Sequence, residues 1–211
     1  MKVTRFAPSP TGNLHIGGVR TALFNYVFSK QSGGLFLVRV EDTDRERSKK
    51  EYEEDIISGL EWLGISPDKK PIRQSERSDI YQKAAEKLIN SGNAYWCDCS
   101  PDDLEEMRKQ QAAAGTKPMY DGRSRDLGLA RSDSTVLRLA TPLEGETIVK
   151  DLIRGEIIFR NSELDDLILI RSDGTPTYHF CNVVDDFDQG VTTVIRGCLL
   201  YTSPSPRDDS Q

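Results

Sequence analysis

The N-terminal segment constrains the fold most, because an apolar stretch runs into a proline- and glycine-rich loop and then into a helix. Residues 2–7 predict a strand, and Pro8 and Pro10 end it, since proline cannot donate a hydrogen bond to a β-ladder. A helix is expected to begin near Gly17. Its free N–H groups and positive dipole end favour a phosphate, to which His15 can donate a hydrogen bond. This pattern predicts nucleotide binding at the carboxyl end of the first strand of an α/β sheet, and the alternative is a plain strand–turn–helix corner with a surface histidine.

Strands and helices alternate through the first part of the chain. Apolar residues at helical spacing predict helices over residues 19–30, 48–64 and 79–91. Residues 35–40 are a nearly continuous apolar strand, as in a buried parallel sheet. This alternation predicts a doubly wound, Rossmann-type α/β domain over residues 1–93. In the first helix, the expected apolar face consists of Val19, Leu23, Tyr26 and Val27.

The middle of the chain has a different pattern and predicts an inserted α+β module over residues 94–163. A strand is expected over residues 94–99. Ser100 with Asp103 resembles an N-terminal cap of a helix that continues to residue 114. A loop follows over residues 115–134. Alternating residues over 136–140 and 147–159 then predict antiparallel strands with a turn at Arg154 and Gly155.

The Rossmann-type sheet is expected to resume over residues 164–197. The predicted elements are a strand over 167–170, a helix over 178–187 and a strand over 192–196. Residues 198–211 have no periodic pattern and are rich in serine and proline. They are interpreted either as an aberrant read-through at the end of a sequenced fragment or as a flexible tail.

Composition narrows the class of protein. The chain has 211 residues, of which 36% are hydrophobic and 29% charged, as is typical of globular proteins in solution. No secretory signal or membrane span is expected, and four sparse cysteines suit a reducing compartment, so the prediction is a cytoplasmic protein. The net charge of −6 means that any nucleic-acid surface must be a local basic patch.

Four ordered motifs carry a resemblance to a known family. They are Ala7 to Gly12, Leu14 to Gly18, Arg20 to Leu23, and Arg39 to Arg45. Together they resemble the N-terminal part of a glutamyl-tRNA synthetase, a class I aminoacyl-tRNA synthetase, from residue 2 to about Gly197. The segment from His15 to Gly18 corresponds to the HIGH signature of class I enzymes in its H-x-G-G form.

The resemblance implies a two-step reaction. Glutamate attacks the α-phosphorus of ATP, which is bound with Mg²⁺, and the glutamyl group then passes to the terminal adenosine of tRNA(Glu). Without a covalent enzyme intermediate, catalysis consists of positioning and charge stabilisation. By resemblance, the ATP-binding and catalytic residues are His15, Gly17 and Gly18, and further ATP contacts come from Pro8, Thr11 and Gly12.

L-Glutamate needs cations for its carboxylates and an anion for its ammonium group. By resemblance, Arg5 and Arg196 grip the side-chain carboxylate and Glu41 binds the ammonium group. Further contacts in the same pocket come from Ala7, Ser9, Tyr178 and Asn182. The alternative interpretation makes the two arginines surface ion-pair residues and Tyr178 a core aromatic residue.

The resemblance also predicts the tRNA surface. The module over residues 94–163 corresponds to the family's insertion that holds the acceptor end of tRNA. Arg45 and Arg47 correspond to a corner that meets the acceptor stem, although a solvated, charged helix start explains them equally well. A monomer is expected.

No metal site is expected. Cys97 and Cys99 are half of a zinc site that some bacterial members complete. Here Ser124 and Asp126 stand at the completing positions, and serine is a poor zinc ligand. The cysteines are therefore interpreted as small buried residues.

Two family features are not found: the lysine-bearing K-M-S-K-S loop and the helical anticodon-binding domain. The chain is therefore expected to be an N-terminal portion that is inactive by itself, and a non-catalytic nucleotide- or tRNA-binding fragment stays open. The paralogue that glutamylates a queuosine base is an alternative. It is disfavoured by two segments, Arg20 to Leu23 and Glu41 to Asp44. Glutaminyl-tRNA synthetase is a less favoured alternative, because it usually has Asp in place of Glu41. A dinucleotide-binding oxidoreductase is disfavoured as well, because it needs a G-x-G-x-x-G motif after the first strand.

Overall fold

The computed structural model describes residues 1–197 and divides the chain into two compact units. The first unit contains residues 1–78 and the segment from Asn182 onward, and the second contains Asp79–Cys181. The division falls at residues 78 and 181, whereas the sequence placed the boundaries of the inserted module at 93 and 163. The predicted aberrant tail, residues 198–211, lies outside the described residues.

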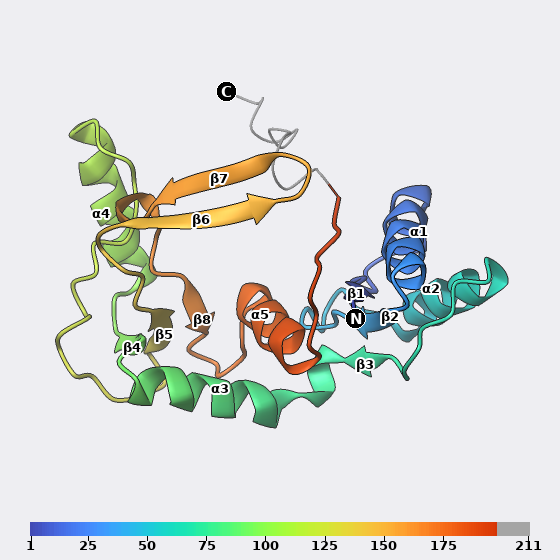
Figure 1. Cartoon of the computed structure of the whole chain (residues 1–211). Coiled ribbons are helices and arrows are strands. Elements are labelled where there is room, and N and C mark those ends of the chain that lie inside the picture. The colour runs from blue at the N-terminus through green and yellow to red at the C-terminus, as the bar shows by residue number, and fades with distance from the viewer. Residues whose placement is uncertain (198–211) are drawn as a thin grey trace. The chain divides into compact units, whose positions relative to one another are not determined.

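A parallel sheet forms the centre of the first unit (Figure 1). Its strand order is β1 (Val3–Phe6), β2 (Leu35–Val40), β3 (Ile72–Arg73), and both pairings are parallel. The connecting helices are α1 (Ile16–Gln31) and α2 (Lys50–Trp62). The core consists of Phe6, Ala22, Phe36, Val38, Ile56, Leu60 and Ile65. This β-α-β-α-β succession confirms the predicted α/β class, and only the two-residue strand β3 was not predicted.

Helix α1 buries a different face from the predicted one. Its buried residues are Ala22, Asn25 and Ser29, whereas Leu23 and Val27 are 44% and 40% exposed. Asn25 is held by hydrogen bonds: its backbone carbonyl oxygen accepts from the Thr4 hydroxyl at 2.8 Å, and its side-chain amide donates to the Ile195 carbonyl at 2.9 Å. The predicted face was therefore wrong for Leu23 and Val27, because polar contacts with distant segments decide which side of α1 faces inward.

The predicted strand over residues 192–196 is also wrong within the described residues. This segment runs beside β1 through a few bonds only. The amides of Thr192 and Thr193 donate to the Val3 carbonyl at 2.9 and 3.2 Å, and the Val3 amide donates to the Thr192 hydroxyl. Since these bonds all converge on Val3, no ladder forms, and the segment is extended without being a strand.

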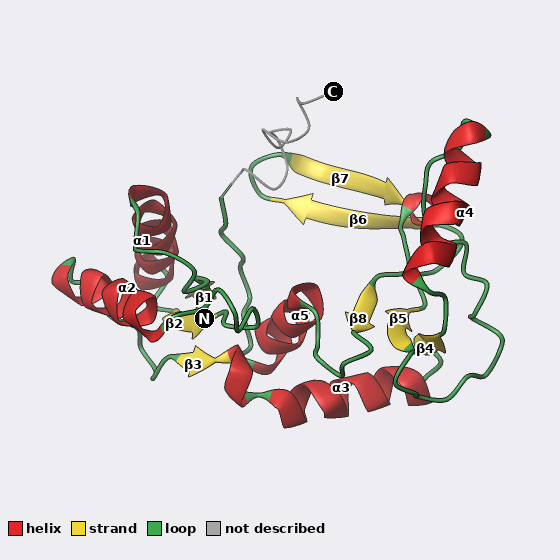
Figure 2. Cartoon of the chain, turned by 180° about the vertical axis from the view of Figure 1, so that it is seen from behind, coloured by secondary structure: helices red, strands yellow, loops and turns green. Residues whose placement is uncertain are grey.

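The second unit contains a separate antiparallel sheet and a hairpin (Figure 2). The sheet has the order β4 (Ala94–Cys97), β5 (Val136–Leu139), β8 (Ile168–Ile170), and the hairpin consists of β6 (Glu146–Asp151) and β7 (Gly155–Arg160). The helices are α3 (Ser78–Asn90) and α4 (Pro101–Ala113). Strand β8 was expected in the parallel sheet of the first unit, and this assignment is wrong because β8 pairs with β5.

Helix α5 (Tyr178–Asp188) begins in the second unit, and from Asn182 onward it belongs to the first. Over residues 1–197, no helix combines the length and the apolar character that a membrane crossing requires.

Candidate functional site

His15 is the N-cap residue of α1, at the end of the loop that follows β1. Its backbone is extended, and its Nδ1 atom accepts a hydrogen bond from the Gly17 amide at 3.1 Å. Because Nδ1 is an acceptor, the proton of the neutral ring lies on Nε2, which can donate to a ligand. A Cβ atom on residue 17 would lie 3.0 Å from His15 Cε1, so only glycine leaves enough room for the imidazole ring in this position.

The first turn of α1 contains no acidic residue, so nothing in that turn neutralises the positive end of the helix. The predicted anion site at this helix end therefore has a suitable charge. One predicted feature changes: the Gly17 amide is not free, because it is bonded to His15.

The loop between β1 and α1 is fixed by its backbone. The Pro8 carbonyl accepts from the Glu41 amide at 2.8 Å, and the Pro10 carbonyl accepts from the Lys49 amide at 2.9 Å. Further along, the Leu14 amide donates to the Asp55 carboxylate at 2.7 Å. The remaining predicted loop residues are half-buried or exposed, as a ligand contact requires: Ala7, Ser9, Thr11, Gly12 and Gly18.

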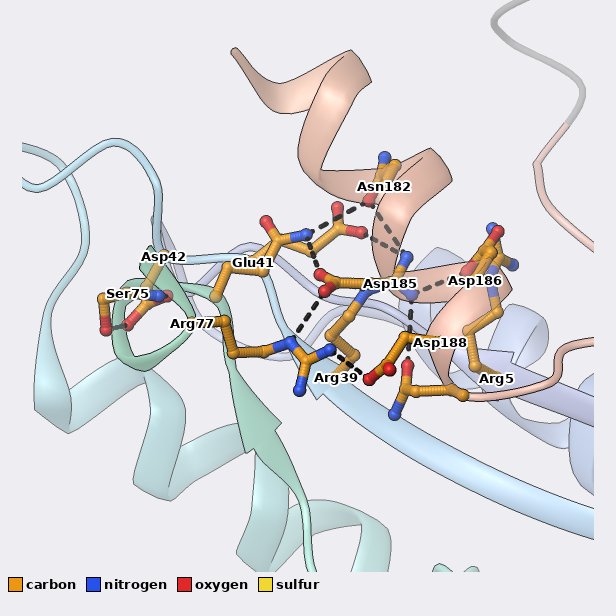
Figure 3. A network of polar contacts seen from close by, with 12 residues as sticks. Arg5, Arg39, Glu41, Asp42, Ser75, Arg77, Asn182, Asp185, Asp186 and Asp188 are labelled. Carbon is orange, nitrogen blue, oxygen red and sulfur yellow. Dashed lines mark hydrogen bonds and ion pairs between the residues drawn. The ribbon is translucent and has the colours of Figure 1, made fainter. Parts of the chain in front are cut away.

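Arg39 is the centre of a buried polar network at the end of β2 (Figure 3). Its side chain is fully buried. The guanidinium Nη1 donates to Asp186 Oδ1 at 2.6 Å and to Gln189 Oε1 at 3.2 Å. Its Nη2 donates to Glu41 Oε1 at 3.1 Å and to Asn182 Oδ1 at 2.9 Å. We call Arg39 with Arg5, Glu41, Asn182, Asp185 and Asp186 the Arg39 network.

The network joins three predicted glutamate contacts. Glu41 and Asn182 bond directly to Arg39, and Arg5 Nε donates to Asp186 Oδ1 at 3.0 Å. Burial opposes the charge of Arg39, but the hydrogen bond and charge of Asp186 and the charge of Glu41 outweigh it and raise the pKa of the guanidinium. Arg39 is therefore a permanent cation at this site.

A second arginine holds the outer side of the network. The fully buried Asp185 accepts from Arg77 Nε at 2.7 Å and from Gln74 Nε2 at 2.8 Å, and Arg77 Nη2 donates to Asp188 at 2.6 Å. Burial opposes the charge of Arg77, yet its bonds to Asp188 and Asp185 raise the pKa of Arg77 above its ordinary value. This part of α5 is thus tied to the turn that follows β3.

Four predicted glutamate contacts are not part of the network: the loop residues Ala7 and Ser9, and Tyr178 and Arg196. Arg196 is exposed and lies in the extended segment after α5. Tyr178 is the first residue of α5 and belongs to the second unit, where its ring lies edge-on to His179 with ring centres 5.4 Å apart. The roles of these residues stay predictions.

The predicted tRNA contacts lie in the turn that precedes α2. Arg45 and Arg47 are both exposed, and Arg47 Nη1 lies 3.8 Å from Asp44 Oδ2. An exposed pair of this kind contributes little to stability, so the arginines remain available to a polyanion.

The residues around Cys97 do not suit zinc. The Cys97 thiol donates to the Tyr120 hydroxyl at 3.3 Å and accepts from the Ser124 hydroxyl at 3.6 Å, while Asp126 is exposed. No cluster of three or more potential metal ligands occurs between residues 1 and 197. Cys97 is a soft ligand, but the tyrosine and serine hydroxyls bonded to it do not supply the further thiolate or imidazole ligands that zinc prefers. The absence of zinc stays a prediction.

The sequence analysis missed Arg39 and the two aspartates of α5 that face it. The available signal was an arginine inside an apolar strand, because a buried charge requires a buried partner. Asp185 and Asp186 offered that partner, but they lie more than 140 positions further along the chain.

Known proteins that are similar to this chain belong to one family. Residues 2–204 match the family described as "tRNA synthetases class I (E and Q), catalytic domain". The chain is 53% identical over 193 residues to a glutamate–tRNA ligase of Thermodesulfovibrio yellowstonii and 51% identical over 195 residues to one of Oleidesulfovibrio alaskensis. These matches cover 92% of this chain and 42% of each relative.

A solved structure is similar over the same region. It is a glutamate tRNA ligase from Elizabethkingia meningosepticum in complex with its amino acid, with a TM-score of 0.82 and 39% sequence identity over 94% of this chain and 44% of that one. The chain thus spans less than half the length of the relatives it matches.

Proposed function

The chain belongs to the class I tRNA synthetases of the glutamate and glutamine group, and from this premise we propose that it carries the ATP- and glutamate-binding part of a glutamate–tRNA ligase. The observation that carries the proposal is the 53% identity over 92% of the chain to a relative of that name. The buried Arg39 network supports it, since it gathers three of the residues expected to contact glutamate.

ATP binds at the loop after β1 and at the start of α1. His15 Nε2 donates to a phosphate oxygen, while the Gly17 amide keeps Nδ1 in place. Pro8, Thr11, Gly12 and Gly18 line the same site. ATP brings Mg²⁺, which offsets the charge of the phosphates.

Glutamate binds at the Arg39 network. Arg5 and Arg196 receive the side-chain carboxylate, and Glu41 receives the ammonium group. Ala7, Ser9 and Asn182 complete the pocket. The α-carboxylate then attacks the α-phosphorus of ATP, a bond to pyrophosphate breaks, and glutamyl-adenylate forms. The residues accelerate this step by positioning both substrates and by stabilising charge.

In the second step, the glutamyl group passes to tRNA(Glu). The module predicted over residues 94–163 holds the acceptor end, and Arg45 and Arg47 contact the acceptor stem through phosphate groups. Monomeric action and a cytoplasmic location stay predictions.

A hybrid enzyme tests the proposal. Residues 1–197 replace the matching segment of the Thermodesulfovibrio yellowstonii relative, and ATP–pyrophosphate exchange is measured with L-glutamate, with L-glutamine and with no amino acid. We expect exchange that depends on L-glutamate. Exchange that glutamine supports equally well, or no exchange in a folded hybrid, contradicts the proposal.

Charging of tRNA separates this function from glutamylation of a queuosine base. Periodate oxidation of the terminal ribose removes the 3′ acceptor but leaves the anticodon bases intact. We expect oxidised tRNA(Glu) to accept no glutamate from the hybrid. Transfer to oxidised tRNA favours the queuosine alternative.

A further inference from the structure

Arg39 occupies an unusual place for a charged residue. It lies on β2, the central strand of the parallel sheet, and its side chain is fully buried. Glu41 follows two positions later, so both side chains point to the same face of the sheet. The buried charge is stabilised by hydrogen bonds to Glu41, at the end of β2, and to Asn182 and Asp186 of α5 (Figure 3).

Arg39 fixes the orientation of the Asn182 side chain. Asn182 Oδ1 accepts from Arg39 Nη2 at 2.9 Å and from Gln74 Nε2 at 3.4 Å. With the oxygen bonded twice, the amide nitrogen is the end that is left for a ligand. That nitrogen donates no hydrogen bond within residues 1–197. Asn182 therefore presents a donor, as a substrate carboxylate requires.

Asp186 fixes the orientation of Arg5 in a similar way. A single carboxylate oxygen, Oδ1, accepts from Arg5 Nε at 3.0 Å and from Arg39 Nη1 at 2.6 Å. Over the described part of the chain, the two Nη groups of Arg5 donate no hydrogen bond. With Nε held by Asp186, these groups form a fork that matches both oxygens of a carboxylate.

We propose that Arg39 and Asp186 are positioning residues that select glutamate, an inference that rests on the proposed function. Arg39 turns the Asn182 amide and the Glu41 carboxylate toward the amino acid, and Asp186 turns the fork of Arg5 toward its side chain. Neither residue touches the substrate. A carboxylate accepts from both Nη groups of Arg5, whereas the amide of glutamine accepts with one oxygen only.

Binding to the full 211-residue chain tests the proposal. Calorimetry measures the Kd of L-glutamate, L-glutamine and ATP for the wild type and for Asp186→Asn, which keeps the shape of the side chain and removes its charge. The matched control is Asp188→Asn, which makes the same change two residues further along α5, where the carboxylate is half exposed and pairs with Arg77.

We expect Asp186→Asn to raise the Kd of L-glutamate about tenfold to a hundredfold, because misplacing a binding group by about 1 Å has effects of this order. The preference for glutamate over glutamine falls with it. The Kd of ATP and all constants of Asp188→Asn stay within about twofold of the wild type. Arg39→Lys is expected to behave like Asp186→Asn, since one ammonium group cannot reach the same set of acceptors.

A spectroscopic readout separates positioning from general damage. In ¹⁵N spectra, the Nε–H signal of Arg5 is expected to shift in Asp186→Asn and to stay in Asp188→Asn. Equal glutamate affinity in the two variants, or loss of glutamate and ATP binding together, overturns the positioning role but leaves the proposed function standing. A folded wild-type chain that binds neither ligand contradicts the proposed function, and the positioning role falls with it.

Discussion

Each compact unit contains a cluster of arginines and carboxylates, and the central residues of the two clusters have opposite charges. In the first unit the centre is a cation, Arg39, and donor groups of Arg5 and Asn182 are left without partners in the described chain. In the second unit the centre is an anion, Asp166, which is 3% exposed. Its carboxylate accepts from the Tyr95 hydroxyl, from Arg125 and from the Thr141 amide.

The Asp166 cluster closes on itself. Arg125 Nε donates to Asp166 at 2.7 Å, and Arg125 Nη2 also donates to the Thr141 carbonyl at 2.8 Å. Burial raises the pKa of Tyr95, and its hydrogen bond to Asp166 adds to the effect, so the hydroxyl remains a donor. The cluster thereby ties the loop around residue 125 to strand β4. The closed cluster is therefore expected to stabilise the fold, whereas the open Arg39 network is the one that we propose binds a ligand.

Asp166→Ala is expected to have the largest effect on stability. It removes the partner of a largely buried arginine, and breaking such a pair costs about 3 kcal/mol or more. Thermal and denaturant unfolding measure the loss. Asp121→Ala is the control, since Asp121 and Arg123 form an exposed pair, for which about 1 kcal/mol or less is expected. Equal losses in the two variants, or a weakened glutamate affinity in Asp166→Ala, break the distinction between the clusters.

His15→Ala tests the ligand side of the comparison in the hybrid enzyme. Losing a phosphate contact is expected to lower the turnover of exchange about a hundredfold to a thousandfold, with little change in the KM of glutamate. The variant also removes the cap of α1, which by itself costs about 1 kcal/mol of stability.

His15→Asn separates these two effects. Asparagine is a good N-cap residue but lacks the Nε2 donor. Stability should therefore recover while turnover stays low. Recovery of turnover in His15→Asn means that His15 acts only as a cap.

Local signals in the sequence were sufficient where the partners are close along the chain. The capping box of α4 is confirmed: the Asp103 amide donates to the Ser100 hydroxyl at 3.1 Å, and the Ser100 amide donates to the Asp103 carboxylate at 3.0 Å. The strand, the proline loop and the helix that begins at Ile16 are confirmed as well. Each of these features depends on residues within about one helical turn.

Contacts between distant segments explain the failures. Asn25 is buried in α1 because the Ile195 carbonyl, 170 positions away, accepts a hydrogen bond from its side-chain amide. The strand character of residues 168–170 was correct, but an apolar pattern does not reveal which strand will pair with it. Arg39 depends in the same way on Asp186, 147 positions away. The residue types of the site were thus predictable, and the network that orients them was not.

Arg196→Gln tests whether the exposed Arg196 binds glutamate together with the Arg39 network. If Arg196 binds the side-chain carboxylate, losing one charged hydrogen bond of about 1.5–3 kcal/mol raises the Kd of L-glutamate roughly tenfold to a hundredfold. ATP binding and stability stay unchanged. Arg108→Gln, an exposed arginine of α4, controls for the loss of one positive charge. Glutamate affinity equal to that of the control assigns the carboxylate to Arg5 alone.

The smallest expected effect concerns an exposed carboxylate, at the opposite extreme from Asp166. Hydrogen bonds from the Ser100 hydroxyl and the Ser100 amide lower the pKa of Asp103 below its ordinary value of 3.8. A pKa that folding lowers stabilises the folded state above the unfolded value, and this contribution is lost as the pH falls through the folded value. The first turn of α4 should therefore fray below about pH 4, which amide hydrogen exchange detects. Asp103→Asn should abolish the pH dependence, and Asp102→Asn should keep it. An unchanged first turn at acidic pH means that the helix start is held by packing, and that the exposed carboxylate contributes nothing there.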